Sequence, residues 1–284
     1  LNPNVIRARS VCGGIAQGIL LRLSTMDLKR LGELPASRGV EGEQGALDSG
    51  LSRLLKSLDL QLLDDNGTTS AVLEAQRAQI LEQIVKGASC AQAIVAAEEH
   101  FCQQFSSSAS EYLRERALDV RDVCFQLLQQ IYGSQRFPSQ TALQQSSICM
   151  ADELTPSQFL ELDKSLLKGL LLSNGGSTSH TVILARSFNI PTLVGVDAEA
   201  LAAYVGQEVQ IDGDLGLVAV DMSPEVQRYY QLEAQVQQRI REQQRAYLST
   251  QGRSADGVRL EVAANIAHSI EAVPAFSNGA ESVG

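Results

Sequence analysis

One histidine of this sequence, His180, lies where phosphate chemistry is feasible. The apolar run 169–173 has the length of a buried strand, and the two glycines that follow it permit a sharp turn. Thr178 or Ser179 can then cap a helix by accepting its free amide protons, which places His180 in the first helical turn. The residues before Pro191 predict that this helix ends near position 188.

The predicted helix start determines what the histidine can do. The first turn of a helix presents unpaired N–H groups and a partial positive charge, which together favour a phosphate dianion. The same positive end disfavours imidazolium, so a ring nitrogen of His180 can act as a nucleophile near neutral pH. We interpret His180 as the catalytic residue that carries phosphate, supported by amides and hydroxyls of Gly176, Thr178 and Ser179. The alternative is a histidine with no chemical task.

Residues 175–195 read GGSTSHTVILARSFNIPTLVG and resemble the phosphohistidine signature of phosphoenolpyruvate-utilising enzymes. Serine at position 179 is similar to Enzyme I of the bacterial phosphotransferase system, since the dikinase and synthase branch usually has cysteine there. The resemblance implies that phosphoenolpyruvate, bound on a barrel domain with Mg²⁺, phosphorylates His180 at Nε2. It implies that a histidine of an HPr-type carrier then receives the phosphoryl group, in the service of sugar transport. Arg186 could contact phosphate or instead pair with an acidic side chain or the helix end.

Composition and charge narrow the class of protein. The chain has 284 residues, 44% hydrophobic and 20% charged, which suits a globular protein with one large or two modest cores. A net charge of −10 and a pI near 4.9 argue against nucleic acid and favour a basic protein partner. Five cysteines without metal-ligand spacing indicate reduced, mostly buried thiols in a cytoplasmic protein. No run has the length of a membrane span and no signal peptide is visible.

Apolar residues at helical spacing predict four helices in the first half of the chain, at about 43–63, 70–86, 90–105 and 108–132. Each has one apolar stripe, so we expect the four to bury these stripes together as a bundle. Extended segments are expected within 5–24, with breaks at Gly13-Gly14 and at Gly18, and at 147–152, 192–196 and 208–220, the last as a hairpin. These strands predict an α/β subdomain built from both sides of the bundle.

The predicted organisation is an α/β phosphohistidine, or swivelling, subdomain that carries an inserted four-helix subdomain. The expected ranges are 1–24 and 135–221 for the α/β subdomain, 25–134 for the helical HPr-binding subdomain, 222–252 for a long linker helix, and 253–284 for the rest. The last range resembles the start of the (β/α)8 barrel of Enzyme I, with 258–266 as its first strand, and stops before the phosphoenolpyruvate-binding residues. Because the sequence starts at Leu1 rather than Met, we expect a fragment of a longer protein, such as a fusion with a preceding carrier domain.

The fourth predicted helix contains YLRERALDVRD at 112–122, which is similar to the Y-L-K-E-R-A-x-D-V-R-D segment of Enzyme I. Since Enzyme I docks HPr on this bundle, the resemblance implies partner contacts by Glu74, Arg116 and Arg121. The spacing of these charges alone would also fit a solvated helix surface. Where the family has F-E-G-H on the second helix, this chain has LEAQ at 73–76, so the glutamate is kept and the histidine is not.

A second departure from the family lies at Phe159. The segment DELTPS at 152–157 resembles the D-L-T-P-S of Enzyme I, but a hydroxyl residue usually follows four positions after the threonine, close to the active histidine. If that hydroxyl orients the ring in relatives, another group must do so here.

Two other functions stay open: the swivelling domain of a dikinase or synthase, and a non-catalytic docking or regulatory module. The resemblance implies no cofactor and no metal ligands within this chain. We expect the fragment to be a monomer, whereas the resemblance implies a homodimer for the full-length protein, because dimerisation there depends on the barrel.

Overall fold

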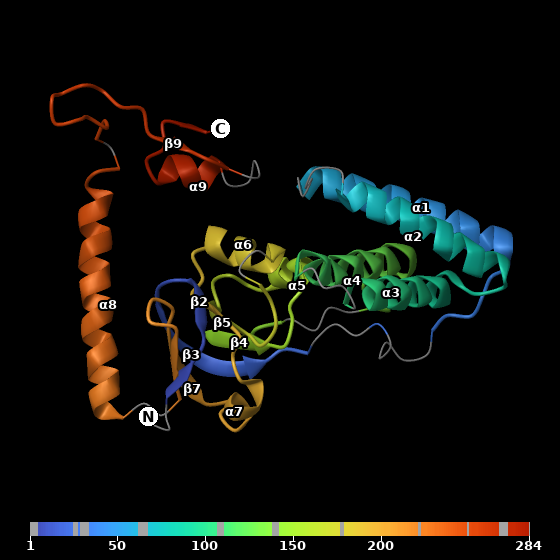
Figure 1. Cartoon of the computed structure of the whole chain (residues 1–284), viewed down its shortest axis with the longest axis horizontal. Coiled ribbons are helices and arrows are strands. Elements are labelled where there is room, and N and C mark those ends of the chain that lie inside the picture. Colours follow the sequence, from blue (N-terminus) through green and yellow to red (C-terminus); the bar gives the residue numbers. More distant parts are fainter. Residues whose placement is uncertain are drawn as a thin grey trace. The chain divides into compact units, whose positions relative to one another are not determined.

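The computed structural model describes residues 5–24, 28, 34–61, 68–106, 111–137, 142–176, 179–220, 223–248, 250–266 and 272–283. The chain forms two compact units (Figure 1), one made of residues 1–60 and 64–221 and the other of residues 61–63 and 222–284. Among the described residues, no helix combines the length and the apolar character needed to cross a membrane.

A mixed sheet of eight strands forms the α/β part of the first unit, in the order β1-β8-β7-β3-β4-β5-β6-β2. The strands are β1 Val5–Arg7, β2 Arg9–Cys12, β3 Ile15–Arg22, β4 Ser147–Ala151, β5 Leu167–Leu172, β6 Thr192–Val194, β7 Glu208–Asp212 and β8 Leu217–Ala219. The strands β3 to β6 are parallel, and antiparallel partners flank them on both sides. The strands predicted at 147–152 and 192–196 and the predicted hairpin are therefore present.

One predicted strand break is wrong. Gly18 lies inside β3, where a Cβ would meet the backbone of Ser146 and Ser147 at 3.0 to 3.2 Å. The glycine is there because two backbones approach closely, and not because the strand ends. The other predicted break is present, since β2 ends before Gly13 and Gly14 has a positive φ of 110°.

Both faces of the central strands are covered. All five residues of β4 are buried, and they alternate between two cores. Cys149 and Ala151 join the core on the side of α5 (Pro156–Glu161) and α6 (His180–Ser187), whereas Ile148 and Met150 join the core that contains Leu201 of α7 (Ala198–Ala202). Near-continuous apolar runs, rather than alternating ones, are what such doubly covered parallel strands require.

Four helices lie between β3 and β4 in the sequence: α1 Val40–Gln61, α2 Thr68–Val85, α3 Cys90–Ser106 and α4 Glu111–Tyr132. They share one apolar core, to which α1 contributes Leu47, Leu51 and Leu54. The leucines at helical spacing in this segment also include Leu55, which is 43% exposed, and those at positions 58 and 62, whose side chains lie outside the described residues. The predicted helical subdomain, inserted in a mixed α/β sheet, is thus present.

A buried carboxylate joins α1 to the start of α3. Glu43 accepts hydrogen bonds from the backbone N–H of Cys90 at 2.8 Å and from the Arg38 side chain at 3.1 Å. Burial alone raises the pKa of Glu43, but the hydrogen bonds from Arg38 and Cys90 outweigh it and lower the pKa to about 2. The ionised carboxylate therefore serves as the anionic cap of the α3 N-terminus.

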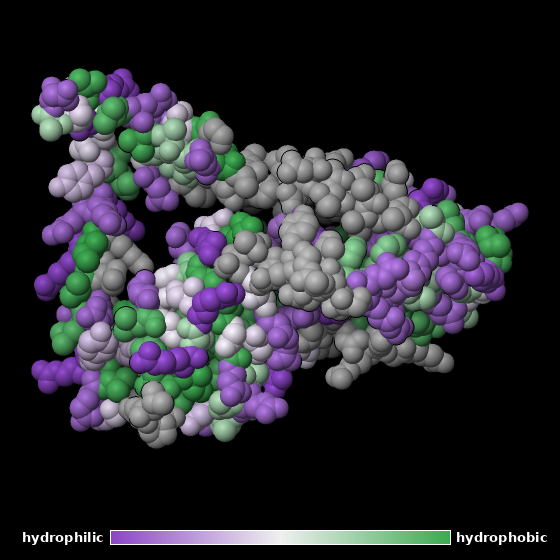
Figure 2. Space-filling view, viewed as in Figure 1, coloured by the Kyte–Doolittle hydropathy of each residue, from purple (hydrophilic) through white to green (hydrophobic). Residues whose placement is uncertain are grey.

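The second unit contains the long helix α8, Pro224–Arg245, which the Ser223 side chain caps. The apolar side chains Tyr229, Leu232, Val236 and Ile240 are exposed. Hydrophilic and hydrophobic residues are interspersed along the surface of α8 (Figure 2). Further on, β9 (Ala263–Ala264) pairs in parallel with β10 (Ser282–Val283) across α9 (Ala272–Ser277). The strand predicted at 258–266 is reduced to β9, because residues 253–259 turn back on themselves through an antiparallel bridge between Arg253 and Arg259.

Candidate functional site

His180 is the first residue of α6, and the local sequence explains why the helix begins there. Gly175 has a φ of 130°, which allows the chain to turn sharply after β5. Of the two predicted caps, Ser179 caps the helix, and its Oγ accepts the N–H of Val182 at 3.4 Å. Thr178 lies outside the described residues, and Gly176 is buried beside the turn. The His180 side chain is 35% exposed, so a ligand can reach it.

A carboxylate from the helical subdomain contacts the His180 ring. Asp119 of α4 places Oδ1 3.1 Å from Nδ1 of His180, and its Oδ2 accepts from Nη1 of Arg116 at 3.0 Å. A carboxylate can only accept hydrogen bonds, so this contact assigns a proton to Nδ1, and in the neutral imidazole the lone pair is then on Nε2. The ring is thus arranged for attack through Nε2, the nitrogen that the sequence analysis expects to carry phosphate.

Two further contacts connect α4 to the α/β part next to the histidine. Arg121 pairs with Glu98 of α3 at 3.0 Å and with Glu153, which precedes α5, at 3.1 Å. Asp122 accepts the N–H of Ser157 at 3.2 Å and the Ser157 hydroxyl. Burial lowers the pKa of Arg121 by itself, but its two carboxylate partners raise it above the usual value. Burial raises the pKa of Asp122, although hydrogen bonds from Ser157 oppose the rise.

Phe159 fills the position for which the resemblance implies a hydroxyl residue. Its side chain is fully buried in the core between the sheet, α5 and α6, and it packs edge-on against Phe188 with ring centroids 5.9 Å apart. The Lys164 ammonium lies 4.7 Å from the Phe159 ring centroid. Residue 159 therefore serves packing, and it offers no polar atom to the histidine.

The remaining residues singled out from the sequence have varied surroundings. Arg186 donates from Nε to the carbonyl of Val11 at 2.7 Å, which ties α6 to β2. Arg116 contacts Asp119, and Arg121 holds two carboxylates of its own chain. Glu74 belongs to α2, but its side chain lies outside the described residues.

Asp119 contacts the proposed site without being identifiable from the sequence. Asp119 belongs to the segment that resembles Enzyme I and lies three positions after Arg116. The sequence therefore predicts that the two side chains share one face of the helix. Nothing in the spacing connects it to His180, because 61 positions separate the two residues. The two residues meet because α4 packs against α5, which in turn packs against α6.

In the part of the chain that the structure describes, no group of three or more His, Cys, Asp or Glu side chains is placed to hold a metal ion. The five cysteines are free thiols, and four of them are buried. Burial is the main reason that the pKa of Cys90, Cys102 and Cys149 rises to about 12, which leaves these thiols unreactive.

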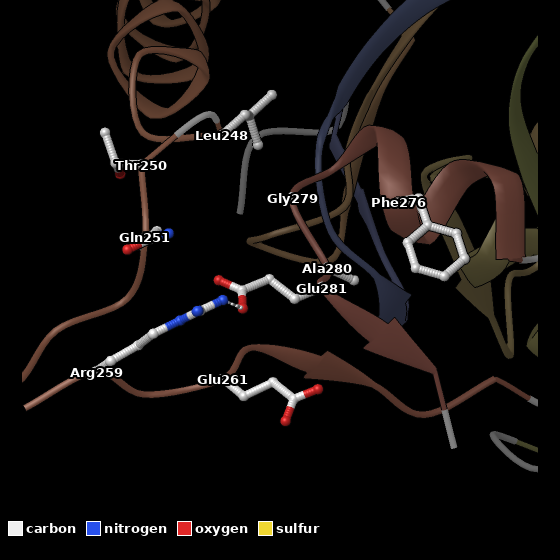
Figure 3. Close-up of a pocket in the computed structure, with 9 residues that line it drawn as sticks. All are labelled: Leu248, Thr250, Gln251, Arg259, Glu261, Phe276, Gly279, Ala280 and Glu281. Atoms are coloured by element: carbon white, nitrogen blue, oxygen red, sulfur yellow. Dashed lines mark hydrogen bonds and ion pairs between the residues drawn. The ribbon is translucent and has the colours of Figure 1, made fainter.

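A separate pocket of about 830 Å³ lies within the second unit (Figure 3). Arg259 and Glu281 form an ion pair of 2.9 Å on its wall, and Phe276 lines it as well. None of the residues predicted to take part in phosphoryl transfer lines this pocket.

The sequence and fold are similar to known proteins. Residues 143–216 match the family described as PEP-utilising enzyme, mobile domain. The whole chain is 61% identical to part of Multiphosphoryl transfer protein 2 and 34% identical to part of Multiphosphoryl transfer protein 1, both of Escherichia coli K12. It spans 35% of the length of each of these curated relatives. A solved structure described as the NMR solution structure of Enzyme I (nEIt) matches 82% of this chain and 99% of its own, with 22% identity and a TM-score of 0.50, which shows a shared fold.

Proposed function

Because residues 1–284 form a region like the amino-terminal domain of Enzyme I of the phosphotransferase system, we propose that the chain transfers phosphoryl groups through a phosphohistidine at His180. The observation that carries this proposal is the position of His180 at the start of α6, with Nδ1 held by Asp119 and Nε2 bearing the lone pair. Amide groups of a first helical turn and a bound carboxylate suit a nitrogen that accepts and releases a phosphate dianion.

Two transfers make up the proposed reaction. In the first, the Nε2 lone pair of His180 forms a bond to phosphorus while the bond between phosphorus and the enol oxygen of phosphoenolpyruvate breaks, and the enolate leaves and takes a proton from water. In the second, a carrier histidine attacks phosphorus and the electron pair of the broken N–P bond returns to Nε2. The Mg²⁺ that the resemblance implies for the longer protein would offset charge on phosphoenolpyruvate there.

The first turn of α6 would bind the transferred phosphate. Ser179 accepts a hydrogen bond from Val182 through Oγ, which leaves its hydroxyl proton to donate to a phosphate oxygen. Gly176 and Thr178 would supply backbone amides and a second hydroxyl. These groups act only when a dianion is present, so we expect them to support transfer more than folding.

We propose an HPr-type phosphocarrier as the partner, bound to the helical subdomain. A net charge of −10 suits a basic partner, and Glu74 and Arg116 are the proposed contacts. Arg121, the third residue singled out, is already bound to Glu98 and Glu153, so we propose that it supports the docking surface through these pairs. Transfer in the cytoplasm to a sugar-transport relay is part of the same proposal.

Labelling tests the proposal directly. The purified chain is mixed with a ³²P-phosphorylated HPr-type carrier, and the acid-labile label is located by mass spectrometry. We expect label on His180, none in His180→Ala, and an unchanged circular dichroism spectrum for that variant. His100→Ala is the matched control, since this histidine of α3 is exposed and its described hydrogen bond is with Gln104, one turn along the same helix. The variant should label fully. Label on His180→Ala, or label acquired from ATP without a carrier, would contradict the proposal.

A further inference from the structure

Resting on the proposed function, we propose that Asp119 is the positioning residue of the phosphohistidine site. In this proposal Asp119 selects Nε2 of His180 as the phosphoryl acceptor. The proposal starts from one contact, the 3.1 Å between Asp119 Oδ1 and His180 Nδ1. Phe159 cannot orient the ring, because it has no polar atom and is buried among apolar side chains. A carboxylate of the helical subdomain takes this role instead.

The contact decides which nitrogen reacts. A neutral imidazole that donates from Nδ1 to a carboxylate has its lone pair on Nε2, and the ring cannot turn without losing the hydrogen bond. When Nε2 bonds to phosphorus, positive charge develops on the ring, and the carboxylate lies close enough to stabilise it. The proton stays on Nδ1 in both transfers, so the electron pair alone moves between Nε2 and phosphorus and no separate base is needed.

Arg116 explains how a carboxylate can lie so near a site for a dianion. Its Nη1 binds the second oxygen of Asp119 at 3.0 Å, so the pair has no net charge and repels an arriving phosphate less than a lone carboxylate would. The Arg116 and Asp119 side chains are only 14% and 27% exposed, and they lie three residues apart on α4. Each carboxylate oxygen therefore has one partner, which fixes the plane of the Asp119 carboxylate.

The position of α4 itself is fixed against the α/β part. Arg121 binds Glu153, and Asp122 binds Ser157, both within a few residues of Asp119 along the helix. Asp119 is thus held beside α6 by a helix that is anchored at its next turn. The site is consequently shared between the two subdomains, one supplying the nucleophile and the other supplying the group that orients it.

The test compares Asp119→Ala and Asp119→Asn with the unchanged 284-residue chain. In ¹⁵N NMR spectra the His180 ring of the unchanged chain should show a proton on Nδ1, and ³²P or ³¹P labelling from a phosphorylated carrier should give phosphate on Nε2 alone. Asp119→Ala should show a mixture of ring tautomers and a fraction of phosphate on Nδ1. Its labelling should be slower by about 10- to 100-fold, by analogy with the loss seen when the hydrogen-bond partner of a metal-ligating histidine is removed. Asp119→Asn retains an acceptor but no charge, so it should keep the tautomer and label at an intermediate rate.

Asp48→Asn is the control, because Asp48 forms an exposed ion pair with Arg77 between α1 and α2 and should leave every readout unchanged. Arg116→Gln is a second variant in case Asp119→Ala fails to fold. It should mix the His180 ring tautomers in spectra taken without the carrier, because it loosens Asp119. The proposal on Asp119 would be overturned if folded Asp119→Ala and Arg116→Gln kept the ring tautomer, the phosphorylated nitrogen and the labelling rate of the unchanged chain. Label on His180 in the unchanged chain would then still support the proposed function. Absence of label on His180 in the unchanged chain would instead count against the proposed function itself.

Discussion

The Asp119 carboxylate lies 3.1 Å from Nδ1 of His180, although the two residues are 61 positions apart and belong to different subdomains. The contact relates the helical subdomain to the chemistry of α6 and not only to partner binding. The residues around the histidine fall into three groups. Asp119 and Arg116 orient the ring, Arg121 and Asp122 hold α4 in place, and Ser179 starts α6. Each group has a different expected response to substitution.

Ser179→Ala should weaken the start of α6 and slow phosphoryl transfer about tenfold, since the hydroxyl both caps the helix and faces the proposed phosphate. Loss of the cap alone is expected to cost about 1 kcal/mol in the free energy of unfolding, measured by urea denaturation. Ser223→Ala is the matched control, because Ser223 caps α8 with the same 3.4 Å contact to an amide. It should weaken its helix and leave transfer unchanged; equal transfer rates in both variants would show that Ser179 only caps.

Arg121→Ala should destabilise the first unit by about 2–3 kcal/mol, because Glu98, 6% exposed, would lose its guanidinium partner and Glu153 would lose its link to α4. The loss is measured as the shift of the urea midpoint. Arg77→Ala removes an exposed pair with Asp48 of the same kind and should change the free energy of unfolding by less than about 1 kcal/mol. Comparable shifts in the two variants would mean that burial of the pair contributes little.

Glu43→Gln should destabilise the helical subdomain, and the loss should depend on pH. The folded-state pKa of Glu43, about 2, lies below its unfolded value near 4.5, so the carboxylate contributes stability that is complete above about pH 4.5 and is lost as the pH falls toward 2. At neutral pH we expect a loss of about 1–3 kcal/mol, because the buried N–H of Cys90 and the Arg38 side chain lose their anionic acceptor. The variant and the unchanged chain should converge in acid, and a difference that persists at pH 2 would refute this origin.

Phe159→Thr should not improve phosphoryl transfer, even though it restores a hydroxyl where relatives usually have one. The substitution empties space in a closely packed core beside Phe188 and should cost about 3–4 kcal/mol in the free energy of unfolding. The transfer rate per folded molecule should stay unchanged, because Asp119 already orients the ring. Phe276→Thr, at a 49% exposed phenylalanine of the second unit, should cost less than about 1 kcal/mol.

Cys12 should be the one thiol that reacts quickly with a thiol reagent such as DTNB in the folded chain. The other four cysteines are buried, and burial raises the pKa of each of them. Burial also raises the pKa of Cys12, so its labelling should become faster as the pH rises above neutrality. Cys12→Ser should abolish the fast phase and leave four thiols that react only in denaturant, whereas a second fast thiol would contradict the described packing.

The parts of the fold that local chemistry determines could be read from the sequence. Three helices start after Ser179, Ser223 and Thr155 because these side chains cap the next turn. The helix α4 ends at Gly133, which has a φ of 86°. What could not be read depends on partners far away in the chain. A glycine at position 18 predicts a strand break when only nearby residues are considered. Its close neighbours in space, residues 146 and 147, are far away in the sequence.

The same distinction applies to the site. His180 could be found because its motif is continuous in the sequence, whereas Asp119 is placed beside it only by the packing of α4. Arg186 illustrates the opposite case, since its motif position suggested a role at phosphate but its Nε binds the carbonyl of Val11 on an edge strand. Residue type and spacing identify the proposed nucleophile, and tertiary contacts identify the residues that hold it.

The placement of the helical subdomain between β3 and β4 has a consequence for how the protein is made. These two strands are direct neighbours in the sheet, with Arg22 opposite Met150, yet the whole of residues 23–146 must leave the ribosome before they can meet. The helices need only nearby partners, so they can assemble during synthesis while the unpaired β3 waits. We therefore expect nascent chains that end shortly after α4 to be helical but to expose β3 to chaperones. The eight-stranded sheet should be completed only once β7 and β8 have emerged.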